Sequence, residues 1–397
     1  MQTAHSLHRA RRALPAICGC RRAFSSSSAH SRIGETWESF FEPAHKVSVT
    51  VPATTSNLGP GFDSFGLALN MRNKIIVERA DEFSITVHGE GEDGGGLIKA
   101  DESNLVVQFC KKALESMGKT MPPLRFECHN TVPPQRGLGS SSSAFVAGIA
   151  AGFALGGKEV YAPLSKKAIL QMAADAEGHA DNISAAIYGG LQVNFRSSPE
   201  GYARAGQWIT QRVHVPSGLH CVLFIPDEKH LMARGSARGA LPELYTRADA
   251  VHNIGRAAML INCFATGQFD AMRFAMEDRL HQPYRAKLFP HARILEAALK
   301  AGAHGAFLSA QGPTVIAVCG GSTGVGQDVG SDTMSQFLAE AVSIAMRDAA
   351  LAEGMDGEVH VAMPSEEGLT TSGWSEDGTP LWGQEWEEAL LSRELFE

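Results

Sequence analysis

A glycine- and serine-rich turn followed by a run of small residues constrains the fold of this chain more than any other feature. Residues 134–152 read PQRGLGSSSSAFVAGIAAG and directly follow residues 124–133, whose alternating apolar positions predict a strand. Gly137 and Gly139 permit positive φ values and a close approach of the backbone to a ligand, and the serines at 140–143 offer hydroxyls and a helix N-cap. The small side chains that follow let a helix pack deeply against a sheet. Its N-terminus then faces a pocket suited to a phosphate chain.

A capped turn without a ligand is the structural alternative for this segment. No Gly-Lys-Ser/Thr follows the glycines, so the turn is not a Walker phosphate loop. Residues 89–94, GEGEDG, formally match the dinucleotide-binding fingerprint. Because Glu90, Glu92 and Asp93 would repel a pyrophosphate and no helix begins there, we expect an exposed hairpin loop.

The composition limits the number of domains and the kinds of partner. With 397 residues, of which 44% are hydrophobic, the chain can bury more than one core, and we expect two domains. The net charge of -8 gives no reason to expect nucleic acid or an anionic membrane as the main partner. No stretch approaches the roughly 20 apolar residues that cross a bilayer. The seven cysteines are odd in number and scattered, so we expect reduced thiols rather than a disulfide framework.

Periodicity places strands early in the chain and alternates strands with helices later, which favours an α+β fold over a doubly wound parallel sheet. Strands are expected near residues 47–51, 67–80, 83–91, 124–133, 219–226, 305–310, 314–319 and 358–363, the first of them ending at Pro52. Helices are expected near residues 104–117, 164–178, 248–266, 293–301 and 334–352, the second of them capped by Ser165. The pattern restarts between residues 215 and 230, which indicates a domain boundary.

Four segments together resemble the motifs of the GHMP family of small-molecule kinases, in its homoserine kinase branch. VPATTSNLGPGFDSFGLAL, residues 51–69, is similar to the first motif, and the glycine-serine turn is similar to the second. EGHADNISAAIYGG, residues 177–190, resembles a segment specific to homoserine kinases. GAFLSAQGPTVIAV, residues 305–318, resembles the third motif, so that the resemblance spans residues 46–363.

The resemblance implies a two-domain α+β architecture and an ATP-dependent reaction. An N-terminal, ribosomal-protein-like α+β domain would cover residues 44–220, and a C-terminal, ferredoxin-like α+β domain would cover residues 221–364. The implied substrate is L-homoserine, phosphorylated on its side-chain hydroxyl on the route to threonine by an enzyme that is commonly a homodimer. ATP would bind through Pro134, Arg136, Gly137, Leu138, Gly139, Ser140, Ser141, Ser142, Ser143 and Asn104.

Mg²⁺ would bridge the phosphates of the nucleotide. The resemblance implies Ser141 as one ligand together with an acid, but the glutamate that some relatives carry eight residues before the histidine corresponds to Gln171 here. We therefore interpret Glu177 as the metal acid, with Asp175 behind it. Sparse ligation is no objection, because Mg²⁺ needs only one or two protein oxygens beside phosphate and water. A surface contact of Glu177 is the alternative.

The resemblance also implies a set of residues for the amino-acid substrate. They are Asn57, Asp63, His179, Asp181, Asn182, Arg238 and Arg285. Arginines suit a carboxylate through charge-assisted hydrogen bonds, and Asp63 suits an ammonium group. Each residue taken alone has a structural alternative, as a turn former, a loop histidine or a solvated charge.

Asn182 and Asp181 are the expected catalytic residues. In mevalonate kinase, of the same family, an aspartate accepts the hydroxyl proton at the place that Asn182 holds here. Asparagine is no general base at neutral pH, so the implied mechanism is direct attack of an oriented hydroxyl on the γ-phosphoryl group.

Two departures from the family pattern bear on this interpretation. Arg234 stands where relatives usually carry threonine, and residues 309–313 read Ser-Ala-Gln-Gly-Pro where Ser-Gly-Ser-Gly-Pro is common. Two alternatives stay open: a kinase of another small, mevalonate-like alcohol, and a binding protein of this fold without turnover.

The two ends of the chain differ from the middle. Residues 1–43 are rich in arginine and serine and hold no acid before Glu35, which is typical of an organellar transit peptide. The segment RRAFSSSS points to a mitochondrion, whereas threonine synthesis suits the plastid stroma, which we favour; a disordered basic tail on a cytoplasmic protein is the alternative. Residues 365–397 would form a C-terminal extension, in which an amphipathic helix over residues 372–397 docks through its tryptophans.

Overall fold

The computed structural model describes residues 42–92, 97–198, 206–227, 234–288, 290–321 and 329–383, except for the side chains of residues 234–236 and 329–334. The chain divides into two units, Met1–Glu38 and Ser39–Glu397. All of the described residues belong to the second unit.

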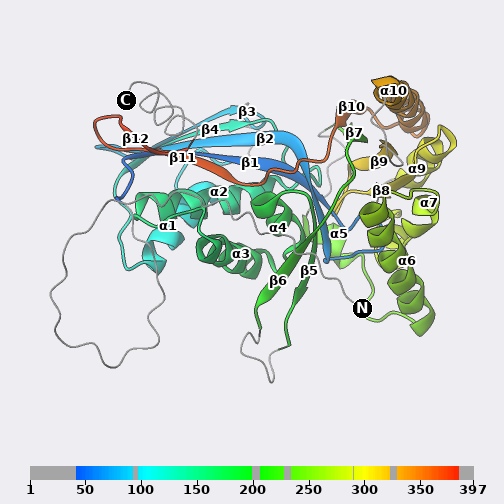
Figure 1. Cartoon of the computed structure of the whole chain (residues 1–397), viewed down its shortest axis with the longest axis horizontal. Helices are drawn as coiled ribbons and strands as arrows, with labels where there is room; N and C mark the ends of the chain where they lie inside the picture. The colour runs from blue at the N-terminus through cyan, green and yellow to red at the C-terminus, as the bar shows by residue number, and fades with distance from the viewer. Residues whose placement is uncertain are drawn as a thin grey trace, which may run out of the picture. The chain divides into compact units, whose positions relative to one another are not determined.

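An eight-stranded sheet forms the larger part of this unit (Figure 1). Its strands are β1 (Lys46–Ser56), β2 (Phe65–Arg79), β3 (Ser84–Gly89), β4 (Leu124–Asn130), β5 (Leu191–Arg196), β6 (Trp208–Val213), β11 (Thr370–Trp374) and β12 (Pro380–Trp382). Their order is β12-β11-β1-β2-β4-β3, and β5 pairs with both β2 and β6. All neighbours are antiparallel except β3 and β4.

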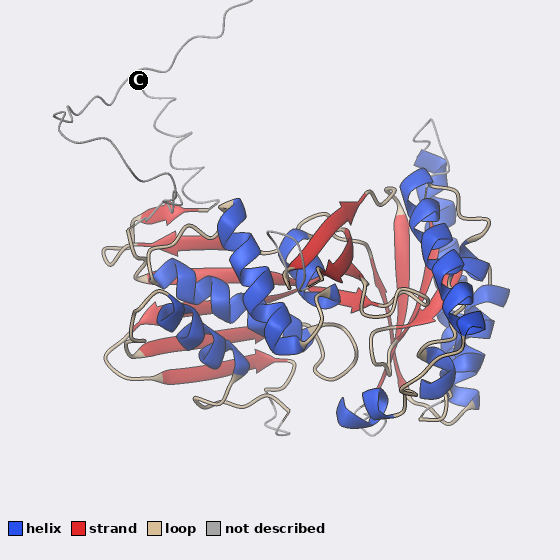
Figure 2. Cartoon of the chain, turned by 90° about the horizontal axis from the view of Figure 1, so that it is seen from below, coloured by secondary structure: helices blue, strands red, loops and turns tan. Residues whose placement is uncertain are grey.

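Four helices cover one face of this sheet (Figure 2). They are α1 (Leu105–Ser116), α2 (Ser140–Leu155), α3 (Pro163–Glu177) and α4 (Asp181–Tyr188). Helix α2 lies deepest, and a Cβ added to Gly148 or Gly152 would come within 2.5 Å of a backbone oxygen of α1. The small residues of α2 therefore let two helices and the sheet pack closely, as the sequence predicts.

A second, antiparallel sheet is built from later parts of the chain. Its strands are β7 (Leu219–Pro226), β8 (Gly305–Leu308), β9 (Val315–Gly320) and β10 (Gly357–Ala362), in the order β10-β7-β9-β8. Helices α9 (His291–Lys300) and α10 (Val329–Ala352) cover one face, and α6 (Arg247–Thr266) with the short α7 (Met272–Ala275) packs its core residues against the other. The short helices α5 (Arg234–Gly239) and α8 (Gln282–Arg285) complete this part. The expected α+β class is confirmed.

Several local predictions need correction. Strand β1 does not end at Pro52 but continues to Ser56, because a register shift between Pro52 and Ala53 accommodates the proline. No serine side chain caps α2, whose N-cap is Gly139 in the left-handed conformation. Ser165 is not a cap either, since α3 begins two residues earlier at Pro163.

Two longer segments also differ from expectation. Residues 89–92 do not belong to a hairpin, because β3 and β4 are parallel and the chain passes through α1 between them. In the C-terminal extension the described residues form β11, which pairs with β1, and β12, which pairs with β11, in place of the expected helix. Residues 384–397 lie outside the described part of the chain.

Two further predictions concern cysteines and membrane-spanning helices, and both can be checked on the described residues. The five cysteines of the described residues, Cys110, Cys128, Cys221, Cys263 and Cys319, are buried and free, as expected. Among the described helices, none is long and apolar enough to span a bilayer.

Candidate active site

Two cavities lie on either side of the glycine-serine turn. The larger, of about 310 Å³, is lined by the end of β1, by the turn, by the segment between α3 and α4, by α5, by α8 and by the loop after β8. The smaller, of about 200 Å³, is lined by Lys99, Asn104, Pro134 and Ser143 together with apolar side chains. Gln135, Ser140 and Ser141 line both, so an extended ligand lying over the turn can reach both cavities.

The turn keeps its shape because two of its residues must be glycine. Gly137 and Gly139 have φ values of 73° and 72°. A Cβ on Gly139 would lie 1.9 Å from Thr54 Oγ1, and a Cβ on Gly137 would lie 2.5 Å from the carbonyl oxygen of Ser309. The turn therefore packs directly on the first and third motifs, and the first turn of α2 faces both cavities.

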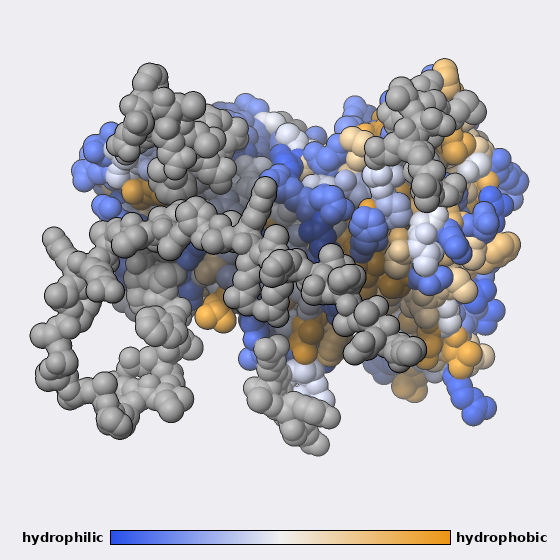
Figure 3. Space-filling view, in the orientation of Figure 1, coloured by the Kyte–Doolittle hydropathy of each residue, from blue (hydrophilic) through white to orange (hydrophobic). Residues whose placement is uncertain are grey.

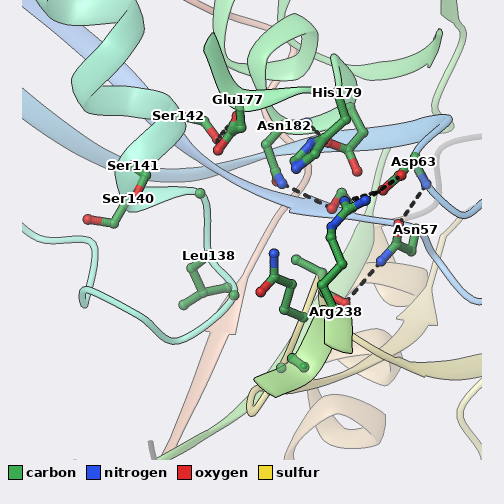
Figure 4. A pocket seen from close by; sticks show the side chains of 18 of the residues that line it. Asn57, Asp63, Leu138, Ser140, Ser141, Ser142, Glu177, His179, Asn182 and Arg238 are labelled. Atoms are coloured by element: carbon green, nitrogen blue, oxygen red, sulfur yellow. Dashed lines mark hydrogen bonds and ion pairs between the residues drawn. The ribbon is translucent and has the colours of Figure 1, made fainter. Parts of the chain in front are cut away.

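Asn182 is held rigidly at the inner wall of the larger cavity (Figure 4). Its Oδ1 accepts a hydrogen bond from Thr54 Oγ1 at 2.8 Å, and its Nδ2 donates one to Ser56 Oγ at 3.0 Å. Both partners come from the end of β1, beyond the bulge at Pro52. The side chain is 5% exposed, so its orientation is determined by these contacts.

His179 and Asp181 form a largely buried ion pair beside Asn182. His179 Nδ1 donates to Asp181 Oδ1 at 2.7 Å, and the backbone N–H of Asn182 donates to the same oxygen. Burial opposes the charged imidazole, but Asp181, Glu177 and Asp63 outweigh burial and raise the pKa of His179 to about 9. Burial likewise opposes the Asp181 carboxylate, yet His179 and the hydrogen bonds keep the pKa of Asp181 below its usual value.

This pair predicts a pH dependence of stability. A raised folded-state pKa stabilises the fold fully below the usual histidine pKa of 6.5, and that contribution is lost as the pH rises through about 9. Relative to the variant His179→Gln, the unfolding free energy of the wild-type protein should therefore fall by on the order of 3 kcal/mol across this range. Urea unfolding at several pH values measures this, and parallel pH profiles for the two proteins would contradict it.

Asp63 and Arg238 form a second, more accessible ion pair at the mouth of the cavity. Arg238 Nη1 and Nη2 donate to the two Asp63 oxygens at 3.1 and 2.9 Å. Asn57 Oδ1 accepts from the backbone N–H of Asp63, and Asn57 Nδ2 donates to the carbonyl oxygen of Ala310. Asn57, Asp63 and Ala310 all have positive φ values, which is strained backbone gathered around one cavity.

Arg285 is a buried cation that is influenced by the charges of Asp63 and Asp278 but forms no ion pair with either of them. Its side chain is 1% exposed and lines the cavity, where Nη1 donates to the carbonyl oxygen of Ala310 at 2.7 Å. None of the ion pairs in the described part of the chain includes it. Burial and the neighbouring Arg238 lower the pKa of Arg285 to about 10, so it is still charged at neutral pH.

The two predicted metal residues, Ser141 and Glu177, both line the larger cavity. The hydroxyl that donates to the Glu177 carboxylate belongs to Ser142, at 2.8 and 3.0 Å from its two oxygens, and Ser141 lines the cavity beside it. Gln171 instead binds the backbone of Trp208, and Asp175 accepts from the Trp208 indole and pairs with Arg196. Neither Gln171 nor Asp175 therefore faces the cavity.

Among the described residues, one group of three side chains lies close enough to hold a metal. The ligand atoms of Asp63, His179 and Asp181 are all within 4.8 Å of one another. Both carboxylates of this group are already engaged, however, since Asp63 pairs with Arg238 and Asp181 accepts from His179 Nδ1 and from the Asn182 N–H. The hydroxyl and carboxylate oxygens of Ser141, Ser142 and Glu177 suit Mg²⁺ better.

The other predicted nucleotide residues fall into two groups. Gly137, Leu138, Gly139, Ser140, Ser141 and Ser142 line the larger cavity, and Asn104, Pro134, Ser140, Ser141 and Ser143 line the smaller one. Arg136 lines neither cavity. Its guanidinium is buried and donates to the carbonyl oxygens of Pro226 and Pro134, so it ties the turn to β7.

Two residues that hold Asn182 were missed from the sequence. Ser56 lines the larger cavity and Thr54 lies behind it, and the polarity of both within a buried strand is the signal that could have found them. Gln311, noted as a departure in the third motif, does line the cavity. The side chain of Arg234 lies outside the described part of the chain.

Comparison with known proteins agrees with this architecture. The family profile "GHMP kinases N terminal domain" matches residues 104–190, and "GHMP kinases C terminal" matches residues 261–351. The two-domain α+β fold, with a phosphate-binding turn beside a polar cavity, is that of a GHMP kinase, and membership of this class implies the use of ATP.

Individual relatives identify the branch of the GHMP kinases to which the chain is similar. Homoserine kinase from Desulfitobacterium hafniense is 36% identical over 323 residues, which cover 81% of this chain and 98% of the relative. Homoserine kinase from Moorella thermoacetica is 41% identical over 69% of this chain and 87% of the relative. The crystal structure of homoserine kinase from Cytophaga hutchinsonii superimposes with a TM-score of 0.67 at 25% identity, covering 84% of this chain and 99% of that one. The chain belongs to the homoserine kinase family.

Proposed function

We propose that this protein transfers the γ-phosphoryl group of ATP to the side-chain hydroxyl of L-homoserine, on the route to threonine. The observation that carries the proposal is the buried Arg285, which forms no ion pair among the described residues, beside Asp63 in a polar cavity that is open at one side. Because the guanidinium is already buried in the fold, a carboxylate that binds it does not have to desolvate it further. The cavity therefore suits a small zwitterion.

The nucleotide would lie over the glycine-serine turn. Its base and ribose would occupy the smaller cavity, with apolar Ile75, Leu97 and Val106 and polar Asn104 and Lys99 in its wall. The phosphates would follow the first turn of α2, whose free N–H groups and helix dipole favour anions. The γ-phosphate then reaches the larger cavity, since Ser140 and Ser141 line both.

Mg²⁺ would be held by Glu177 together with the hydroxyls of Ser141 and Ser142. These hard oxygen donors fit the ion, and phosphate and water would complete its shell. When bound, the ion neutralises charge on the phosphates that are transferred and released.

The ion pair between Asp63 and Arg238 would be exchanged on substrate binding. In this structure the two side chains neutralise each other, and both are partly exposed. An amino acid offers an ammonium group to Asp63 and a carboxylate to Arg238 and Arg285, so both lost contacts are replaced. A ligand with only one of the two charges would leave one side chain unpaired.

The chemistry would depend on positioning rather than on a general base. Each carboxylate that lines the cavity is engaged: Asp63 with Arg238, Glu177 with Ser142, and Asp181 with His179. Phosphoryl transfer of this kind requires little proton removal before the transition state. Asn182 would orient the substrate hydroxyl, and Asp181 would fix the imidazolium and the start of α4.

Asn182→Ala is therefore expected to lower kcat by about tenfold to a hundredfold, because a misoriented hydroxyl attacks less often. The pH profile of kcat should keep its wild-type shape. Asn194→Ala removes a buried amide outside the cavity and serves as the control. A complete loss of turnover with a new, steep pH dependence would instead indicate a base that acts through Asn182.

Release of ADP in the presence of homoserine, threonine, serine or mevalonate tests the proposed function. We expect turnover with L-homoserine well above that with the other three. Preference for mevalonate would support the second kinase alternative, and ATP binding without turnover of any of them would support a binding protein of this fold.

We also propose a homodimer and an organellar location. Apolar side chains of α6, among them Val251, Ile254 and Met259, are exposed, and Figure 3 shows such orange residues in the half that holds this helix. A solution molar mass twice that of the chain would support the dimer. Residues 1–43, as the proposed leader, fall almost entirely outside the described residues; import of a fluorescent fusion into plastids or mitochondria tests their role.

The proposed domain boundary lies near residue 220. There the chain leaves the eight-stranded sheet after β6 and enters the second sheet with β7. Residues 44–220 and 221–364 would be the two family domains, and residues 365–397 the extension.

A further inference from the structure

A buried histidine stands directly behind the cavity, and neither the sequence motifs nor the reaction described above assign it a role. His281 is 0% exposed and lies immediately before α8, four residues from Arg285. Its Nδ1 is 3.0 Å from Arg285 Nη1, and its Nε2 is 2.8 Å from the carbonyl oxygen of Gly59. Its ring stacks on Phe62 with a centroid distance of 5.5 Å.

The partners of His281 permit a single protonation state. The carbonyl oxygen of Gly59 can only accept a hydrogen bond, so Nε2 must carry a proton. The guanidinium of Arg285 can only donate, so Nδ1 must be unprotonated and accept. Burial in particular lowers the pKa of His281 to about 4, which keeps the ring neutral in the same form.

The surroundings hold this tautomer and the ring orientation in place. Asp278 accepts hydrogen bonds from the backbone N–H groups of His281 and Gln282 and from Asn253 Nδ2, and so caps the segment that leads into α8. Asn253 Nδ2 also donates to the carbonyl oxygen of Pro60, next to Gly59. Residues 59–62 of the first motif and α8 are thereby joined through one imidazole.

We propose that His281 is a positioning residue for the substrate carboxylate: its unprotonated Nδ1 holds the Arg285 guanidinium toward the cavity, while its Nε2–H fixes the first-motif loop at Gly59. Three acceptors orient Arg285: His281 Nδ1 and the carbonyl oxygen of Ala310, both bound to Nη1, and the carbonyl oxygen of Ala237, which accepts from Nε at 3.4 Å. Nη2 donates to no acceptor among the described residues and the bond from Nε is long, so this edge of the guanidinium can take a carboxylate. Without the imidazole acceptor, the guanidinium loses one of the three contacts that orient it.

Two substitutions test the roles of the two ring nitrogen atoms of His281 separately. In His281→Asn the side-chain oxygen can take the place of Nδ1 and accept from Arg285, although the bond to Gly59 is lost. In His281→Gln the side-chain amide can take the place of Nε2 and donate to Gly59, although the acceptor for Arg285 is lost. A residue with a merely structural role would show no such difference in substrate binding.

His304→Gln is the matched control. His304 Nε2 also contacts a backbone carbonyl oxygen, that of Gly320 at 2.8 Å, and its ring packs on Phe269 at 5.0 Å. It lies immediately before β8 and lines neither cavity near the turn. His304 is partly buried, so any effect common to His281→Gln and His304→Gln reports the loss of a histidine that contacts a backbone carbonyl oxygen in general.

The test measures KM for L-homoserine, KM for ATP and kcat of the full chain. We expect His281→Gln to raise KM for L-homoserine about tenfold, the order of one lost hydrogen bond to a charged group, with KM for ATP and kcat within about twofold of wild type. His281→Asn should recover most of this loss, and His304→Gln should match wild type. Equal KM values for L-homoserine in His281→Gln and wild type, or equal losses in the Gln and Asn variants, would overturn the proposal.

A binding measurement tests the role of His281 without relying on turnover, and a second variant covers the case in which the first does not fold. This inference rests on the proposed function, so calorimetric binding of L-2-aminobutyrate, which has both charges of homoserine but no reacting hydroxyl, is measured in parallel. Failure of wild type to phosphorylate homoserine would overturn the proposed function alone, whereas unchanged L-2-aminobutyrate affinity in His281→Gln would overturn the role of His281 alone. If His281→Gln does not fold, His281→Phe, which keeps the stacking on Phe62, is expected to show the same weakened binding.

Discussion

Arg285→Met is expected to lower kcat/KM for L-homoserine by about a thousandfold. Truncating one partner of a buried, hydrogen-bonded charge pair costs about 2–5 kcal/mol, and about 1.4 kcal/mol corresponds to a factor of ten. The loss should appear mainly in KM for homoserine, because Arg285 lies on the substrate side of the larger cavity and does not line the smaller one.

The control for Arg285 is an arginine outside both cavities that forms a more exposed ion pair. Arg256 pairs with Glu277 on the outside of α6, where an exposed ion pair contributes little. Arg256→Met should keep kcat/KM near the wild-type value. Arg285→Lys should recover only part of the loss, since an ammonium group cannot bind a carboxylate through two parallel hydrogen bonds. A value for Arg285→Met within threefold of wild type would rule out the proposed carboxylate contact.

Glu177→Gln is expected to lower kcat by about a hundredfold or more at saturating ATP. The change keeps the shape and a hydrogen bond with Ser142 but removes the negative charge that would hold Mg²⁺, and metal stabilisation of the transferred phosphate amounts to several kcal/mol. The Mg²⁺ concentration for half-maximal activity should rise together with the loss of kcat. Titrating activity with Mg²⁺ at fixed ATP measures both.

The same helix offers a matched control for Glu177. Asp175 lies two residues earlier on α3, but its carboxylate contacts the Trp208 indole and Arg196 instead of the cavity. Asp175→Asn should therefore leave the Mg²⁺ dependence unchanged. If both variants respond alike, or if Glu177→Gln keeps the wild-type Mg²⁺ titration, Glu177 is not a metal ligand.

The positions of the elements could be predicted where they depend on local chemistry. The helix near residues 104–117 begins and ends close to its predicted bounds, because Asn104 caps it through a hydrogen bond to the Val106 N–H and its apolar spacing matches one buried face. The glycine-serine turn could likewise be predicted from the sequence. Gly137 and Gly139 have positive φ values and pack so closely that a side chain at either position would clash. Strands β5 and β6 were missed: β5 pairs with β2, which is distant in the sequence, and β6 pairs with the neighbouring β5 through a segment whose middle residues, 210–212, are polar and partly exposed.

By itself the sequence determined the kinds of groups at the site and the order in which the chain supplies them: a turn for phosphates, acids for a cation, arginines for a carboxylate. Only the tertiary structure decided which of these groups meet. In the fold, Arg136 donates a hydrogen bond to the last residue of β7 and lines neither of the two cavities. The Glu177 carboxylate accepts from the hydroxyl of Ser142, and His281 contacts Arg285 from behind the cavity. The physical reason is that a side chain's direction depends on the rotation and packing of its whole element against partners far along the chain, which local residue patterns do not encode.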